Sequence, residues 1–94
     1  MKTVLLIGDS IRESYQEGVK KLLDGEAVVL APGENCRYTK YALWGMHAWM
    51  EALGNPKVDI IHWNTGIWDH HRVTADGLPF TSLEEYAFYT ERLY

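Results

Sequence analysis

The chain has 94 residues, which is enough for one small domain with a thin core and too few for several domains. Hydrophobic residues make up 47% of it and charged residues 23%, and eight Gly and three Pro are scattered along it, so the composition indicates an ordered globular protein. The formal net charge is −4 and Lys and Arg form no block, which excludes a nucleic-acid-binding protein and a protein held by charge to acidic membranes.

The only cysteine is Cys36, which cannot form a disulfide within the chain. Secreted domains of this size usually need disulfides, so we expect a cytoplasmic protein. The apolar run of residues 4–7 is too short for the hydrophobic part of a signal peptide and far too short to cross a bilayer. We therefore expect no membrane span.

The first third of the chain alternates between strand and helix patterns. Residues 3–7 are a continuous aliphatic and β-branched run stopped by Gly8, which is typical of a strand buried on both faces of a parallel sheet. Apolar residues then recur at helical spacing until Asp24-Gly25, and residues 27–31 repeat the buried-strand pattern before Pro32-Gly33. The expected buried face of this first helix comprises Ile11, Tyr15, Val19, Leu22 and Leu23.

A second helix and a third strand follow. Thr39 is a suitable N-cap, and Gly54-Asn55-Pro56 ends the helical pattern. Residues 58–63 then predict a strand. The residues expected to share the buried face of the second helix are Leu43, Trp44, His47, Met50 and Leu53.

The last part of the chain is a long connection over residues 64–81 and a final helix. Ser82-Leu83-Glu84-Glu85 has the spacing of a capping box, and Leu83, Tyr86, Tyr89 and Leu93 fall near one helical face. The sequence stops at Tyr94 without a C-cap glycine or a following strand, so we expect a truncated domain.

The order strand, helix, strand, helix, strand with short loops predicts parallel strands joined by right-handed crossovers. We therefore expect a flavodoxin-like, three-layer α/β/α fold, with residues 1–94 as a single partial domain that ends after the third strand and the helix that follows it.

The strongest chemical signal is Gly8-Asp9-Ser10 at the carboxyl end of the first strand, where open α/β sheets bind ligands. A serine at the start of a helix lies where backbone N–H groups and the helix dipole favour negative charge, which suits an oxyanion beside its hydroxyl. The alternative is that Ser10 serves only as an N-cap.

The segment from Val4 to Ile11 resembles block I of the SGNH/GDSL serine hydrolases, a family of esterases and lipases. The resemblance implies an SGNH-type α/β fold in which Ser10 is the nucleophile and its backbone N–H joins an oxyanion hole. Asp9 would then be adjacent to the site.

Two further regions bear on this resemblance. In the loop after the second strand the family has a glycine whose N–H is an oxyanion donor; counting back from Thr39 puts Arg37 in its place, and Gly33 is the other candidate. After the third strand the family has Gly-x-Asn-Asp, and here the resemblance implies that Asn64 donates its side-chain amide, although Gly66 follows it. The alternatives are a plain loop and an Asn64 that only ties down the connection.

The family's general base, a His in an Asp-x-x-His motif, has no convincing counterpart here. Asp59-Ile60-Ile61-His62 matches this motif in sequence, but residues three apart on a strand point to opposite faces of the sheet. His70 and His71 beside Asp69 have a metal-binding alternative, but no further ligand lies at suitable spacing, so we expect solvent-facing side chains and no metal.

The resemblance implies the N-terminal part of a serine esterase that hydrolyses a small or carbohydrate-borne acyl ester without a metal or organic cofactor. Trp68, in the loop beside the expected site, is assigned to the substrate pocket. The partial sheet is expected to self-associate or to pair with a missing C-terminal segment. The alternative function is a non-catalytic module that binds an anion at the Gly8-Asp9-Ser10 turn or serves in protein interaction.

Overall fold

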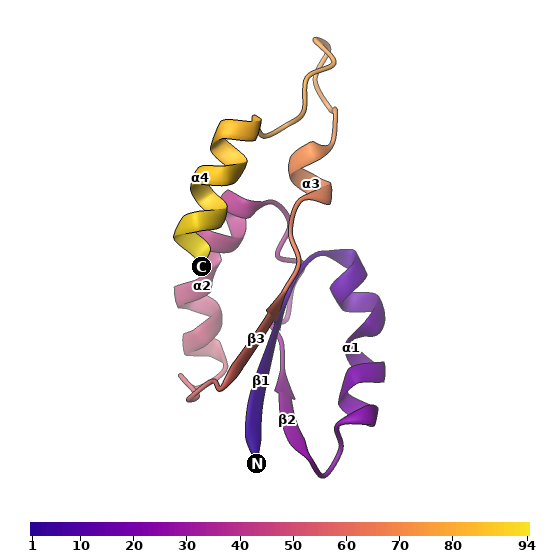
Figure 1. The fold of residues 1–94 in the computed structure, drawn as a ribbon, viewed down its shortest axis with the longest axis vertical. Helices are drawn as coiled ribbons and strands as arrows, with labels where there is room; N and C mark the ends of the chain where they lie inside the picture. The colour runs from indigo at the N-terminus through magenta and orange to yellow at the C-terminus, as the bar shows by residue number, and fades with distance from the viewer.

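The computed structural model describes residues 1–94 and contains a three-stranded, wholly parallel sheet (Figure 1). Strand β1 (Lys2–Ile7) is central, with β2 (Ala27–Leu30) on one side and β3 (Ile60–Trp63) on the other. This confirms the parallel α/β architecture, and the order β2-β1-β3 is compatible with a flavodoxin-like fold. All three strands consequently end at the same edge of the sheet.

The helices lie on both faces of this sheet (Figure 1). Helix α1 (Ser10–Leu22) packs against one face, and α2 (Thr39–Ala52) packs against the other. Helix α4 (Leu83–Leu93) runs alongside α2 and adds Leu93 to that layer. A short helix, α3 (Ile67–His70), interrupts the connection that the sequence predicts to be irregular.

The core consists of two apolar layers separated by the sheet, because successive residues of β1 point to opposite faces. Residues 4–7 of β1 are all buried, which confirms the strand buried on both faces. The layer under α1 contains Val4, Leu6 and Val29. The layer under α2 contains Leu5, Ile7, Cys36, Ala42 and Trp49.

The buried face of α1 differs from the predicted one at its first turn. Ile11 is 44% exposed, whereas Arg12 is 1% exposed and occupies the inward position. Tyr15, Val19 and Leu23 pack against the core as predicted, while Leu22 is exposed. Arg12, Tyr15 and Val19 are three and four residues apart, so helical spacing places them in one row.

The buried face of α2 also differs from the prediction. Trp44 is 77% exposed and His47 is exposed, while Gly45 and Trp49 are buried. A Cβ on Gly45 would lie 2.4 Å from a ring atom of Trp49, so this glycine provides the space for the indole one turn later. Met50 and Leu53 pack against the core as predicted. The prediction was wrong at Trp44 and His47, because the absence of a side chain at Gly45, which hydrophobic spacing does not record, lets the ring of Trp49 turn inward.

The predicted N-cap of α2 is wrong as well. Tyr38 occupies the N-cap position and its side chain makes no capping hydrogen bond, while Thr39 is the first helical residue. Ser82 is the N-cap of α4, as its spacing to Glu85 predicts, and its Oγ accepts the Glu85 N–H at 3.2 Å. The Glu85 carboxylate accepts the Ser82 hydroxyl at 3.1 Å and not the Ser82 backbone N–H, so one of the two bonds of a capping box is formed.

Strand β3 forms one edge of the sheet, because its only hydrogen-bonded neighbour is β1. Ile60 and Ile61 are 48% and 56% exposed on its two faces. The edge therefore presents unpaired backbone groups together with apolar side chains. None of the helices combines the length and the apolar character needed to cross a membrane.

Candidate functional site

Ser10 lies at the carboxyl edge of the sheet, directly after the central strand. Strand β1 ends at Ile7, Gly8 and Asp9 make the turn, and Ser10 is the first residue of α1. Its side chain is exposed, so the hydroxyl is open to solvent and not packed in the interior. The N-cap of α1 is Asp9 and not Ser10. Ser10 therefore does not have the capping role that was the alternative to a role in chemistry.

Asp9 is buried, with only 1% of its surface exposed, and holds the turn in place. Its Oδ1 accepts the Ile11 N–H at 3.0 Å, and its backbone carbonyl accepts the Glu13 N–H at 3.1 Å. Its Oδ2 is buried without a hydrogen-bond partner. Buried polar atoms without partners are rare in folded proteins and call for an explanation of the site that contains them.

Asn64 comes from the end of β3 and lies against the same turn. Its backbone N–H donates to the Ile7 carbonyl at 2.9 Å, which continues the pairing of β3 with β1 by one residue. Its side-chain Nδ2 donates to Asp9 Oδ1 at 3.3 Å. The two strand ends therefore bring Asn64 next to the Gly8-Asp9-Ser10 turn.

Gly8 makes this close approach possible. A Cβ on Gly8 would lie 2.0 Å from Asn64 Oδ1 and 2.7 Å from Arg12 Cβ. Only a residue without a side chain fits, because both neighbours occupy the space in which a side chain would begin. The amide of Asn64 consequently rests directly on the backbone that leads to Ser10.

Tyr15 contacts the other side of the Asn64 amide. Its hydroxyl lies 3.4 Å from Asn64 Oδ1 and also 3.4 Å from His62 Nδ1, and its ring meets that of His62 edge to face. Burial raises the pKa of the Tyr15 hydroxyl, so it stays protonated and can donate. With Oδ1 facing Tyr15 and Nδ2 facing Asp9, the orientation of the Asn64 amide is defined at both ends.

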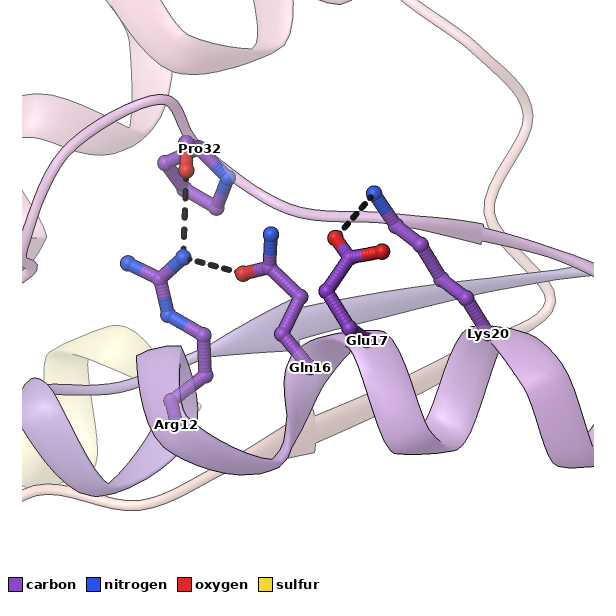
Figure 2. Close-up of polar contacts among 5 residues, drawn as sticks. All are labelled: Arg12, Gln16, Glu17, Lys20 and Pro32. Carbon is purple, nitrogen blue, oxygen red and sulfur yellow. Dashed lines mark hydrogen bonds and ion pairs between the residues drawn. The ribbon is translucent and has the colours of Figure 1, made fainter.

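Arg12 ties the turn to the loop after β2. Its guanidinium donates to the carbonyl of Pro32 at 3.1 Å and to that of Gly8 at 3.3 Å, and it also donates to the carbonyl of Glu34. Figure 2 shows Arg12 reaching Pro32 while Gln16, one turn along α1, accepts a second bond at 2.7 Å. We did not predict this role, although the row of Arg12 with Tyr15 and Val19 is visible in the sequence.

The loop after β2 contains both candidates for the second oxyanion donor. Arg37 has φ of 55°, the left-handed conformation that favours glycine and the feature expected where the family has one. Its N–H, however, donates to Asn35 Oδ1 at 2.7 Å, so this donor is occupied within the loop. Gly33 is exposed, and a side chain there would meet nothing within 4 Å.

Asp69 performs the capping role predicted for Thr39. Its carboxylate is 2% exposed and accepts the Thr39 N–H at 3.1 Å and the Thr39 hydroxyl at 2.7 Å. A carboxylate is favourable there because the N-terminus of α2 carries partial positive charge. This contact joins α3 to the start of α2. The two residues are thirty positions apart in sequence, so local sequence patterns do not predict the contact.

Trp68 lines a cavity of about 480 Å³ at the same end of the molecule, between α3, the start of α2 and the loop that follows α3. Five of the six lining residues are hydrophobic, which is typical of pockets for small organic ligands. The cavity is lined by Tyr38, Ile67, Trp68, His71, Val73 and Phe80.

No family model, curated protein or solved structure matches this chain.

None of the histidines makes a polar contact with the Ser10 side chain. His62 faces Tyr15, and His47 Nε2 lies 3.5 Å from Glu51 Oε1 on the exposed side of α2. His70 and His71 surround a shallow hollow with Arg72. The structure thus brings together Ser10, Asp9 and Asn64, while it pairs no histidine with the serine hydroxyl.

Proposed function

We propose that this chain is the N-terminal part of an SGNH-type serine esterase, with Ser10 as nucleophile and a general-base histidine supplied from outside these residues. The observation that carries the proposal is the Asn64 amide, which hydrogen-bonds Asp9 at 3.3 Å and rests on Gly8 beside the exposed Ser10. The substrate would be a small or carbohydrate-borne acyl ester.

In the reaction, Ser10 Oγ forms a bond to the acyl carbon while the base takes the hydroxyl proton and the carbonyl oxygen becomes negative. The tetrahedral adduct then breaks its bond to the alcohol, which leaves with that proton. Water attacks the resulting acyl-serine by the same steps and releases a carboxylic acid. These steps need no metal or organic cofactor.

The oxyanion would be stabilised by donors at the strand ends. The Ser10 N–H belongs to the first turn of α1, where helical N–H groups have no acceptor within the helix. The Asn64 amide has two N–H bonds, of which Asp9 accepts one, so the second remains to donate. A third donor would come from the loop of Gly33 to Arg37, most simply through Gly33, because the Arg37 N–H already has an acceptor.

The rival function is anion binding at the N-terminus of α1. Asp9 disfavours it, because its buried carboxylate already accepts the Ile11 N–H where an anion would sit. A second negative group there would be repelled at short range. In ester hydrolysis the negative charge is on the carbonyl oxygen of the substrate and exists only in the tetrahedral adduct, so no permanent pair of negative charges forms beside Asp9.

The proposal includes a flavodoxin-like three-layer fold, supported by the order β2-β1-β3 with helices on both faces. It also includes a cytoplasmic location, supported by a single cysteine, Cys36, that is buried and unpaired.

A fluorophosphonate probe tests the proposal, because it reacts with nucleophilic serines in an oxyanion hole. Imidazole would be added to replace the base, and the modified residue would be located by mass spectrometry of peptides. Ser10 is expected to be modified, while Ser82, which is the N-cap of α4, and the exposed Ser14 are expected to stay unmodified. Equal modification of Ser10 and Ser82, or none at Ser10, would contradict the proposal.

The variant Asn64→Ala extends this experiment to the oxyanion donor. Loss of one such donor typically slows reaction by about 10²–10³-fold, so labelling of Ser10 should slow by a comparable factor. Circular dichroism would establish that the variant remains folded. An unchanged labelling rate would remove Asn64 from the site.

A further inference from the structure

The cavity beside α3 gathers apolar side chains that are unusually exposed. Ile67, Val73 and Phe80 are 59%, 60% and 49% exposed, and all three face the same hollow. Phe80 packs edge to face on Tyr38 with ring centroids 4.9 Å apart, which gives one wall a defined shape. Apolar residues collected around a concavity indicate a binding site more strongly than the same residues scattered.

The guanidinium of Arg37, which forms no ion pair, lies at the edge of this cavity beside the ring of its lining residue Trp68. Arg37 precedes the lining residue Tyr38, and its guanidinium carbon lies 6.0 Å from the ring centroid of the lining residue Trp68 and 4.7 Å from that of Tyr41. The ion pairs of the structure are Lys20 with Glu17 and His47 with Glu51, so no carboxylate lies within 4 Å of Arg37.

Glu34, the acidic residue nearest to Arg37 in sequence, and Asp69, next to Trp68, are both held by hydrogen bonds, and the bonds from Tyr41 and Trp49, with a smaller contribution from the charge of Arg37, lower the pKa of the Glu34 carboxyl. Glu34 accepts hydrogen bonds from the Tyr41 hydroxyl and, at 3.0 Å, from Trp49 Nε1. Asp69 is buried and accepts both donors of Thr39. A second cation, Arg72, lies in sequence between two lining residues and donates only to the Gly77 carbonyl, at 3.1 Å.

We propose that this cavity binds a small apolar carboxylate, such as a medium-chain aliphatic or an aromatic acid. The apolar body would lie among Trp68, Val73 and Phe80, and the carboxylate would meet the guanidinium of Arg37 at the rim. Arginine presents a planar fork of donors that matches a carboxylate, and a volume of about 480 Å³ is within the range of small-molecule pockets. The proposal is independent of the chemistry at Ser10.

Octanoate is a suitable probe, with its binding followed by NMR through the four indole N–H resonances of the chain. The resonance of Trp68 would be assigned with Trp68→Phe. Octanoate should shift this resonance and leave that of the exposed Trp44 in place. Octanol, which has the same apolar body without the charge, should bind at least ten-fold more weakly.

Removing the guanidinium tests its contribution. Arg37→Gln should weaken octanoate binding by about ten- to a hundred-fold, the range for losing hydrogen bonds to a charged group. Arg37→Gly serves the same purpose and suits the positive φ at this position, so it covers the case in which the Gln variant misfolds. The matched control is Arg92→Gln, because Arg92 also lies over an aromatic ring, at 5.8 Å from Phe88, but on α4.

The proposal would be overturned by no shift of the Trp68 resonance, by equal affinity for octanol and octanoate, or by unchanged octanoate affinity in both folded Arg37 variants. Weaker binding in Arg92→Gln to the same degree would also overturn it, since the effect would then come from net charge and not from the rim of the cavity.

Discussion

At the scale of single residues, the turn that carries Ser10 depends on a position with no side chain. Gly8 is buried, and its Cα faces the Asn64 amide and the Arg12 stem. Sequence reading places Gly8 in the motif with Ser10, but only the distances reveal that two side chains from other parts of the fold close around it.

Replacing Gly8 with alanine is therefore expected to destabilise the protein. The added methyl would lie 2.0 Å from Asn64 Oδ1, and overpacking of this kind typically costs about 1–3 kcal/mol. Gly33→Ala is the matched control in open space and should change stability by less than about 1 kcal/mol. Thermal unfolding would measure both, and equal melting temperatures for the two variants would refute the close packing at Gly8.

Arg12 is the residue for which sequence reading failed most clearly. A charged residue in the first turn of a helix is expected at the surface, yet Arg12 is buried because carbonyls of Gly8, Pro32 and Glu34 satisfy its donors. Those carbonyls belong to loops. Backbone acceptors in loops have no characteristic side-chain pattern, so the sequence does not predict where they lie. The helical spacing of Arg12 with Tyr15 and Val19 was the one sequence feature that could have indicated its burial.

At the scale of elements, the contact between α3 and α2 fixes the position of α3 at the end of the molecule that contains the cavity. Asp69 caps α2 from a helix of four residues that follows β3. The same short segment carries Trp68, so the cap also sets one wall of the cavity. Local sequence rules assign caps to residues next to a helix, and here the capping group comes from a distant segment.

Asp69→Ala is expected to lower the melting temperature strongly. The cap contributes about 0.5–2 kcal/mol, and the buried Thr39 hydroxyl would lose its acceptor at a further cost of about 1–3 kcal/mol. Ser82→Ala removes a cap from the exposed start of α4 and should cost only about 1 kcal/mol. A smaller loss of melting temperature in Asp69→Ala than in Ser82→Ala would show that the Asp69 contact contributes little.

At the scale of the whole molecule, the chain is elongated. Its extents are 49 × 23 × 19 Å and its radius of gyration is 14.5 Å, against about 12–13 Å for a compact domain of this length. Figure 1 shows the segment between α3 and α4 projecting from the body, while β3 lies at the sheet edge. An open edge with exposed Ile60 and Ile61 is the surface on which another strand would add.

We accordingly predict that the isolated chain self-associates unless a further segment covers this edge. Sedimentation velocity should show a coefficient that rises with protein concentration. Ile61→Lys should suppress the rise, because a lysine on an edge strand opposes pairing, whereas Leu22→Lys, at an exposed helix position, should not. A stable monomer across the concentration range would contradict the prediction.

The sequence alone determined the parts of this protein that depend on neighbouring residues. The aliphatic run of residues 4–7, the stop at Gly8 and the capping box at Ser82 are local patterns, and they predicted the parallel sheet, the position of Ser10 after β1 and the start of α4. Three strand patterns with helices between them leave few other arrangements.

Only the tertiary structure decided which distant groups meet. The Asp69 cap on α2, the buried Arg12 guanidinium and the Asn64 amide on Gly8 each join residues from separate elements. Their positions follow from how the chain satisfies buried hydrogen-bonding groups and fills space. Both requirements arise between residues far apart in sequence, so no local periodicity records them.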